Sequence, residues 1–131
     1  MTQKITCPCG GSSYSSCCQP FHEGTQVAPT PEKLMRSRYS AYAMELEPYL
    51  LSTWHPDTRP DEPLFLEEAP IKWVELKIKQ SQINDDLVSG IVEFVAIFKA
   101  NGKAHRIHEI SEFVKENGRW FYVDGQFPDI K

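Results

Sequence analysis

The sequence lacks long apolar runs and lacks an excess of basic residues. None of its hydrophobic stretches approaches the ~20 residues that a membrane-spanning helix needs, so we expect no membrane span. The 131 residues carry 14 lysines and arginines against 18 aspartates and glutamates, which is a net charge of −4. Because a general nucleic-acid binder presents a basic surface to the phosphates, nucleic acid is not an expected partner.

Familiar catalytic motifs and a secretory signal are also missing. The chain contains no P-loop, no dinucleotide-binding glycine pattern, no Gly-x-Ser-x-Gly and no His-Glu-x-x-His. Residues 1–6 include a lysine but no apolar core of a signal peptide, so we expect a cytoplasmic protein with reduced thiols. The length suits one domain with a short appendage.

What the sequence does contain is a cluster of cysteines near its start: Cys7, Cys9, Cys17 and Cys18. A disulfide within either close pair would close a strained ring, and crossed disulfides would need an oxidising compartment. Two close pairs of thiolates, each on a chain reversal, suit tetrahedral coordination of zinc. A segment this short has no hydrophobic core, so the bound metal would supply its folding energy. We therefore predict a Zn²⁺ site, with reduced thiols as the alternative and His22 as a reserve ligand in place of a vicinal cysteine.

The pattern Cys-Pro-Cys-Gly-x-x-x-Tyr-x-x-Cys-Cys at positions 7–18 resembles the SEC-C motif. This motif is a small zinc-binding knuckle found at the C-terminus of the SecA translocase and in many bacterial proteins. The usual pattern has one more residue between the second and third cysteines. The resemblance implies a knuckle over residues 1–24 that docks a protein partner, followed by a second domain over residues 25–131.

Helical signals begin at Thr30, where a hydroxyl N-cap is followed by proline and then by an acid near the positive end of the helix dipole. The helix is expected to run to about Leu46, and a shorter one should span Pro48 to Trp54. A further helical turn is expected at 64–66. The stripe of the first helix that recurs at helical spacing, and should be buried, is Leu34, Met35, Arg38, Tyr39, Tyr42 and Leu46.

The hydrophobic period changes to two from Ile71, where Val74, Leu76 and Ile78 alternate with charged residues and predict a half-buried strand. A second apolar run covers residues 87–99. Asn-Gly pairs at 101–102 and 117–118 each predict a two-residue hairpin turn. Helices followed by an antiparallel meander of four strands indicate the α+β class.

The hairpin turns also predict the strand register. Phe94 should lie opposite Glu109, and Ser111 opposite Asp124, on an aromatic-rich face that the helices cover. A carboxylate at Glu109 would then need a partner or a raised pKa. The opposite face carries an apolar patch that would suit a homodimer: Val95, Ile97, Ile110 and Val114.

Four segments extend the resemblance beyond the knuckle: Leu-Met-Arg-Ser-Arg-Tyr-Ser-Ala-Tyr at 34–42, Thr-Trp-His-Pro at 53–56, His-Glu-Ile-Ser-Glu-Phe at 108–113, and Gly-Arg-Trp-Phe-Tyr-Val-Asp-Gly at 118–125. They resemble the YchJ-type proteins, which are small uncharacterised bacterial proteins, and the match covers almost the whole chain. It implies a SEC-C knuckle on a domain of the nuclear-transport-factor-2-like (NTF2-like) fold, a cone in which a curved antiparallel sheet wraps around helices. The resemblance supplies a fold and a metal but no reaction.

NTF2-like cones often hold a pocket at the open end of the sheet. The functional interpretation makes Glu109 or His55 a general acid or base. The structural interpretation, which we favour, pairs Glu109 with Arg38 and lets His55 cap a helix end. The residues that could line the pocket are Arg38, Tyr39, Tyr42, Trp54, His55, Glu109, Ser111, Trp120 and Tyr122.

The function that these features predict is a binding or adaptor protein that docks a partner through the zinc knuckle. The alternative is an enzyme or small-ligand receptor that uses the cone. A pocket plugged by Tyr39, Tyr42 and Trp120 would favour the adaptor. An open pocket in which Glu109 lies beside an unpaired polar group would favour the ligand-binding protein.

Overall fold

A computed structural model describes residues 7–11, 13–61, 71–100 and 102–126. Its elements follow the predicted order of helices first and strands second, which confirms the α+β class. They are the 3₁₀ turn η1 (Tyr14–Ser16), α1 (Gln19–His22), α2 (Pro31–Ala43), α3 (Glu47–Ser52), β1 (Ile71–Ile83), β2 (Ser89–Ala100), β3 (Lys103–Glu116) and β4 (Arg119–Gln126).

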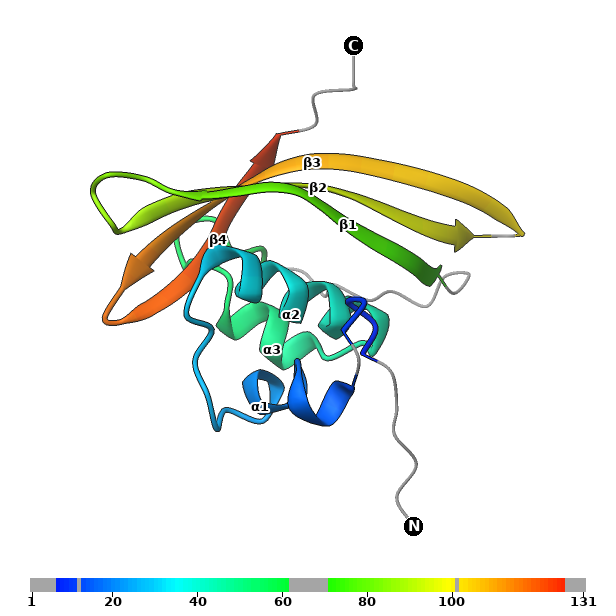
Figure 1. The fold of residues 1–131 in the computed structure, drawn as a ribbon, viewed down its shortest axis with the longest axis horizontal. Helices are drawn as coiled ribbons and strands as arrows, with labels where there is room; N and C mark the ends of the chain where they lie inside the picture. Colours follow the sequence, from blue (N-terminus) through cyan, green and yellow to red (C-terminus); the bar gives the residue numbers. More distant parts are fainter. Residues whose placement is uncertain (1–6, 12, 62–70, 101, 127–131) are drawn as a thin grey trace.

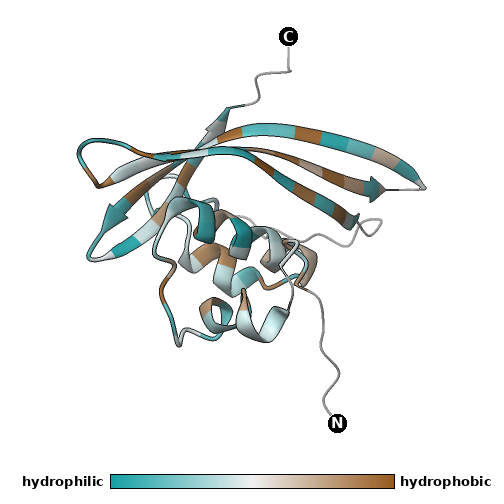
Figure 2. Cartoon of the chain, viewed as in Figure 1, coloured by the Kyte–Doolittle hydropathy of each residue, from teal (hydrophilic) through white to brown (hydrophobic). Residues whose placement is uncertain are grey.

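The strands form one antiparallel sheet in the order β1-β2-β3-β4, which is the predicted meander. Figure 1 shows a long, curved sheet with α2, α3 and the N-terminal turns on one side of it. Apolar and polar residues alternate along the strands in Figure 2, as expected when one face is covered. The covered face buries Val92, Phe94 and Phe113, which belong to the predicted aromatic-rich face.

Helix α2 starts as predicted, because the side chain of Thr30 accepts a hydrogen bond from the backbone N–H of Lys33 at 3.1 Å. It ends at Ala43, short of the predicted Leu46, because Glu45 adopts a left-handed backbone with φ of 57°. The early end lets the chain reverse into α3. The helical turn predicted at 64–66 lies outside the described residues.

Helix α3 also ends earlier than predicted, at Ser52 rather than Trp54. Trp54 instead forms a parallel bridge with Tyr122 of β4, and the N–H of Tyr122 donates to the carbonyl of Thr53 at 2.8 Å. The chain that leaves α3 therefore becomes a short extension of the sheet. This bridge holds the end of α3 against β4.

One bulge in β1 changes which residue faces the helices. The ladder to β2 shifts between Trp73 and Glu75, so Val74 is an extra residue without a partner. Val74 is consequently 49% exposed, whereas Trp73 packs against the core together with Leu76 and Ile78. The prediction of Val74 as a core residue is wrong, because a single extra residue reverses the alternation on one side of it.

The register of the β2–β3 hairpin is the predicted one, with Phe94 opposite Glu109. The pair predicted for Ser111 and Asp124 is wrong. An irregularity between β3 and β4 near position 112 places Gly125 opposite Ser111 instead. A residue without a side chain therefore lies beside this part of β3.

The N-terminal knuckle and the second domain share one hydrophobic cluster. It includes Cys7, Cys9 and Cys18 of the knuckle together with Leu34 and Tyr39 of α2. The knuckle therefore packs against the helices and is not a separate segment joined to them only by the chain. Within the described parts of the chain, no helix has the length and apolar character that crossing a bilayer requires.

Candidate metal centre and candidate binding cavity

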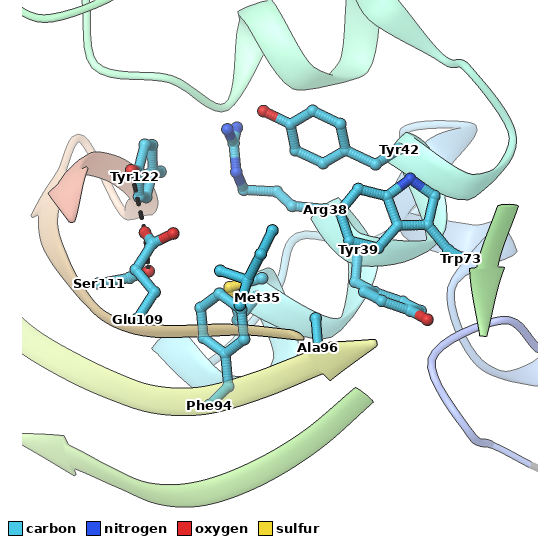
Figure 3. A pocket seen from close by; sticks show the side chains of 11 residues that line it. Met35, Arg38, Tyr39, Tyr42, Trp73, Phe94, Ala96, Glu109, Ser111 and Tyr122 are labelled. Carbon is cyan, nitrogen blue, oxygen red and sulfur yellow. Dashed lines mark hydrogen bonds between the residues drawn. The ribbon is translucent and has the colours of Figure 1, made fainter. Parts of the chain in front are cut away.

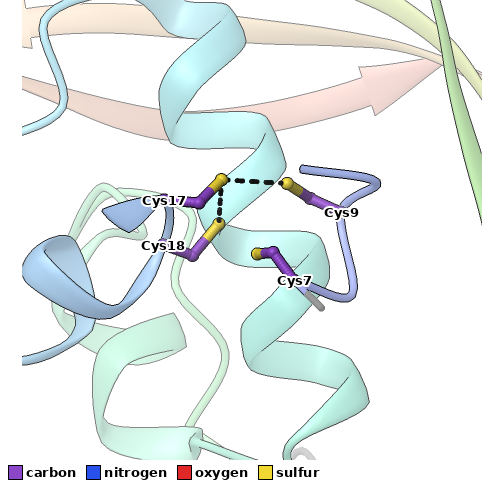
Figure 4. A group of neighbouring side chains, drawn as sticks. All are labelled: Cys7, Cys9, Cys17 and Cys18. Carbon is purple, nitrogen blue, oxygen red and sulfur yellow. Dashed lines mark hydrogen bonds between the residues drawn. The ribbon is translucent and has the colours of Figure 1, made fainter. Parts of the chain in front are cut away.

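The cysteines converge at the end of the molecule where the N-terminal turns meet α2 (Figure 4). All their sulfur atoms lie within 4.8 Å of one another. Cys9 Sγ is 3.5 Å from Cys17 Sγ, which in turn is 3.9 Å from Cys18 Sγ. These separations are too long for disulfides, whose sulfurs lie ~2.05 Å apart. They bracket the edge of about 3.8 Å of a tetrahedron with metal–sulfur bonds of ~2.3 Å, so the donor set fits a tetrahedral metal ion.

Local turns bring the two cysteine pairs together. The N–H of Gly10, whose φ is 103°, donates to the carbonyl of Cys7 at 3.0 Å. Glycine adopts this backbone conformation without a steric penalty. A Cβ added to Gly11 would lie only 2.7 Å from Cys17 Sγ, so the close approach of the two turns also requires glycine there.

The thiols of the cluster differ in how readily they lose a proton. The hydrogen bond from the Cys18 thiol is the largest of the effects that lower the pKa of Cys9 to about 4, against the opposing effect of burial. The same interaction, followed by burial, raises the pKa of Cys18. Burial, followed by the interaction with Cys9, raises the pKa of Cys17 to about 12. Cys9 thus gives up its proton readily, whereas a bound metal ion must displace the protons of Cys17 and Cys18.

Helix α2 supplies the groups that surround the cysteines. The buried hydroxyl of Ser40 lies 3.4 Å from Cys7 Sγ and donates to Cys18 Sγ at 3.3 Å. Arg36 Nη1 donates to the carbonyl oxygen of Cys9 at 3.2 Å. Such outer contacts orient metal ligands and raise metal affinity.

His22, the reserve ligand, is not part of the cluster. Its Nδ1 lies 2.7 Å from the hydroxyl of Tyr14, and its Nε2 lies 2.7 Å from the carbonyl oxygen of Ser37. Because a carbonyl can only accept, Nε2 carries the proton and Nδ1 accepts from Tyr14. Burial lowers the pKa of His22, which favours this neutral form. His22 therefore joins the knuckle to α2 and leaves the metal position to the cysteines.

A cavity of about 260 Å³ lies between α2 and the covered face of the sheet (Figure 3). The candidates from the sequence that line it are Arg38, Tyr39, Tyr42, Glu109, Ser111 and Tyr122. The lining residues that the sequence analysis missed are Met35, Trp73, Phe94, Ala96 and Ile107. Period-two alternation on β2 and β3 was sufficient to find Phe94, Ala96 and Ile107, whereas Trp73 depends on the bulge in β1.

Trp54, His55 and Trp120 are not among the lining residues. The indole N–H of Trp120 donates to the carbonyl oxygen of Pro29 at 3.3 Å. His55 Nε2 lies 2.7 Å from a carboxylate oxygen of Glu116, and its Nδ1 accepts from the backbone rather than capping a helix. The structure therefore does not bring His55 and Glu109 into one pocket as an acid–base pair.

Arg38 extends from α2 and is almost fully buried, with 2% of its surface exposed. Its Nη1 donates to the carbonyl oxygen of Leu50 at 2.8 Å and to Thr53 Oγ1 at 2.7 Å. The guanidinium carbon also lies 4.6 Å from the ring centroid of Tyr122 and 5.1 Å from that of Trp54. Burial lowers the pKa of Arg38, and cation–π contacts with the two rings compensate part of the cost of burying its charge.

Glu109 is held by hydroxyl groups of the sheet. Its Oε2 accepts hydrogen bonds from Ser111 Oγ at 2.7 Å and from the hydroxyl of Tyr122 at 3.2 Å. The predicted ion pair with Arg38 is wrong, because no ion pair joins the two in the described structure and Arg38 bonds to α3 instead. Oε1 accepts no hydrogen bond from any described residue and points toward the cavity in Figure 3. A Cβ on Gly125 would overlap this carboxylate, so the shifted register of β4 makes room for it.

These features can be compared with known proteins. A family model described as the middle NTF2-like domain of YchJ matches residues 30–125. The chain belongs to the YchJ family. It is 49% identical over 126 residues to a UPF0225 protein of Chromobacterium violaceum, with 93% of each chain covered. It is 48% identical to a UPF0225 protein of Deinococcus radiodurans, with 90% of this chain and 86% of the relative covered.

Solved structures support the same assignment for this YchJ-family chain. The solution structure of a SEC-C motif-containing protein from Rhodopseudomonas palustris matches with a TM-score of 0.78 and 34% identity, over 95% of this chain and 98% of that one. The crystal structure of a SEC-C motif-containing protein from Psychrobacter arcticus matches with a TM-score of 0.74 and 28% identity. That match covers 96% of this chain and 82% of the other chain. The predicted family and the NTF2-like fold are thereby confirmed.

Proposed function

We propose that this YchJ-family protein binds a small organic molecule in the NTF2-like cavity. The observation that carries the proposal is the carboxylate oxygen of Glu109 that faces the cavity without a partner among the described residues. Glu109 is only partly buried, and this oxygen is not one of the buried unpaired atoms of the described residues, so it stays accessible from the cavity. A ligand that donates to it would form a charge-assisted hydrogen bond inside the cavity.

We further propose that the cysteine cluster binds zinc and that the ion is structural. Four thiolates in a tetrahedron favour zinc over harder ions, and they leave no open position for a substrate. Cys7, Cys9, Cys17 and Cys18 would hold the ion, whose binding would supply folding energy to the knuckle. Reduced thiols of this kind suit the cytoplasm, where we place the protein.

A protein partner at the knuckle is the second candidate function. Three of the cysteines, Cys7, Cys9 and Cys18, are buried toward α2, so that side of the knuckle already contacts the rest of the chain. A partner would meet the outer side instead, where the exposed side chain of Val27 favours an apolar contact. We rank this function below ligand binding, because one exposed valine is a weaker signal than an unpaired carboxylate oxygen in a cavity.

Native mass spectrometry with thiol counting tests the zinc assignment. We expect one zinc ion for each chain and no reactive thiols until the ion is chelated. Protein that carries no metal after expression with zinc, and whose thiols all react at once, would refute the assignment. The same spectra report whether the chain forms the dimer predicted from the outer face of the sheet.

Filling the cavity tests ligand binding. Ala96 is buried and lines the cavity, so Ala96→Leu would occupy the space that a ligand needs. Ala104 on β3 is exposed, and Ala104→Leu is the matched control. In ligand-observed NMR with a library of small aromatic molecules, binding should be detected for the wild type and the control and be lost in Ala96→Leu. Equal binding by all three proteins, or by none, would overturn the proposed function.

A further inference from the structure

The cavity presents one preorganised acceptor. Hydrogen bonds from Ser111 and Tyr122 to Oε2 fix the orientation of the Glu109 carboxylate, and Oε1 is left facing the cavity (Figure 3). Burial, and then the charge of Glu109, raise the pKa of Tyr122, so its phenol keeps its proton and donates. A ligand group that meets Oε1 must therefore be a hydrogen-bond donor.

The charges of the cavity argue against an anionic ligand. Arg38 is the cation in the lining, but its Nη1 already donates to Leu50 and Thr53. The rings of Tyr122 and Trp54 also pack against its guanidinium. A bound anion would have to displace some of these contacts while lying near the negative charge of Glu109.

The same charges argue against a cationic ligand. Aromatic walls can hold a cation over their faces, and the cavity has such walls in Tyr42 and Trp73. The guanidinium of Arg38 lies in the same lining, however, and like charges repel strongly where water is excluded. With one fixed charge of each sign, the cavity best accepts a molecule that carries no net charge.

The walls favour a flat molecule. Trp73 meets Tyr39 edge-on, with ring centroids 5.6 Å apart and an interplanar angle of 73°, and Phe94 faces the cavity from β2. The volume of about 260 Å³ is slightly smaller than the ~300 Å³ at which the usual range of ligand sites begins, so only a small molecule fits. One ring or two fused rings match this size and these surfaces.

We propose that the ligand is a neutral aromatic or heteroaromatic molecule whose N–H or O–H group donates a hydrogen bond to Oε1 of Glu109. This inference rests on the proposed function, because it names the class of molecule that the cavity takes. The recognition is a hydrogen bond at one oxygen combined with stacking on the surrounding rings. It requires no covalent step.

Indole and benzofuran test the donor directly, because they have nearly the same shape and benzofuran carries an oxygen in place of the indole N–H. Titration of each into the full-length, metal-loaded protein, followed by NMR, gives the two dissociation constants. Indole should bind about tenfold more tightly, since the benzofuran oxygen would leave Oε1 unpaired and repel it.

Glu109→Gln should abolish or reverse this preference, because the hydrogen bonds from Ser111 and Tyr122 would hold the amide oxygen and leave the amide NH2 facing the cavity, where it can donate to benzofuran but cannot accept from indole. Indole should then bind no more tightly than benzofuran, while the thermal midpoint holds or rises. Glu116→Gln is the matched control, since Glu116 lies on the same strand but its carboxylate pairs with His55 outside the cavity lining. That variant should keep the tenfold preference.

Further probes separate failure of the inference from failure of the proposed function. Equal binding of indole and benzofuran to the wild type would overturn the inference that the ligand donates a hydrogen bond to Glu109, while the proposed ligand binding would stand. Tighter binding of benzoate or of benzyltrimethylammonium than of indole would overturn the neutral class. If none of the four probes binds, or if Ala96→Leu binds them unchanged, the proposed function itself fails.

Discussion

The candidate metal centre, formed by Cys7, Cys9, Cys17 and Cys18, and the cavity lie on two sides of α2. Their polar groups differ in whether they have hydrogen-bond partners. In the metal centre, the sulfurs contact one another and Ser40, and both ring nitrogens of the adjoining His22 are bonded. In the cavity, Oε1 of Glu109 lacks a partner among the described residues. A closed set of contacts suits a structural site, whereas unmet polar groups suit a site that awaits a ligand.

The two regions are nevertheless joined by the helix between them. Ser37 and Ser40 of α2 contact the knuckle, while Arg38 and Tyr39 from the same turns line the cavity. This follows from the helical period, which sends neighbouring residues to different faces. Changes to the metal centre should therefore loosen the wall of the cavity that α2 provides, and changes to the cavity should leave the metal centre intact.

Among the substitutions that test this difference between the two regions, Cys9→Ser should have the largest effect on stability. Loss of one ligand should remove most of the metal, and the free energy of unfolding should fall by several kcal/mol out of the ~10 kcal/mol or more that a structural zinc site can supply. Urea unfolding of the full chain measures the change, with Ser15→Ala, an exposed neighbour, as the control. A chelator should bring the wild type to the level of the variant and leave the variant unchanged. Equal stability of wild type and Cys9→Ser would contradict a structural metal.

Gly125→Ala should have the next largest effect, and it should be confined to the cavity. The added methyl group would displace the Glu109 carboxylate, which should cost about 2–3 kcal/mol of stability and remove the preference for indole. Metal content should not change. The double variant with Glu109→Ala should regain much of the lost stability, because the clash is then gone. Loss of metal from Gly125→Ala would show that the two regions are more tightly coupled than we infer.

Ser40→Ala should have the smallest effect, which is confined to the metal centre. Removing the hydroxyl that donates to Cys18 should weaken zinc binding about tenfold, as other losses of outer contacts do. Competition with a coloured chelator measures the affinity. Ser37→Ala is the matched control, since Ser37 is equally buried on α2 but bonds to Leu34 and Tyr49. An equal loss in both variants would point to general loosening of α2 rather than to the contact with sulfur.

Some parts of the candidate sites were predictable and others were not. The cysteine cluster follows from its spacing, and the pairing of Phe94 with Glu109 follows from a tight hairpin turn. Trp73 was missed because the bulge at Val74 reverses the alternation of β1. The ion pair predicted for Arg38 does not form, because the early end of α3 offers it a carbonyl group instead.

The sequence by itself determined the elements whose causes lie within a few residues: the capped start of α2, the turn at Asn117-Gly118 and the close pairs of cysteines. Only the tertiary structure decided which oxygen of Glu109 is free and where the charge of Arg38 is stabilised. Those outcomes depend on strand bulges and helix ends, where one residue more or less moves a side chain to another face. The energies that place such irregularities come from packing between distant segments, which a local pattern does not record.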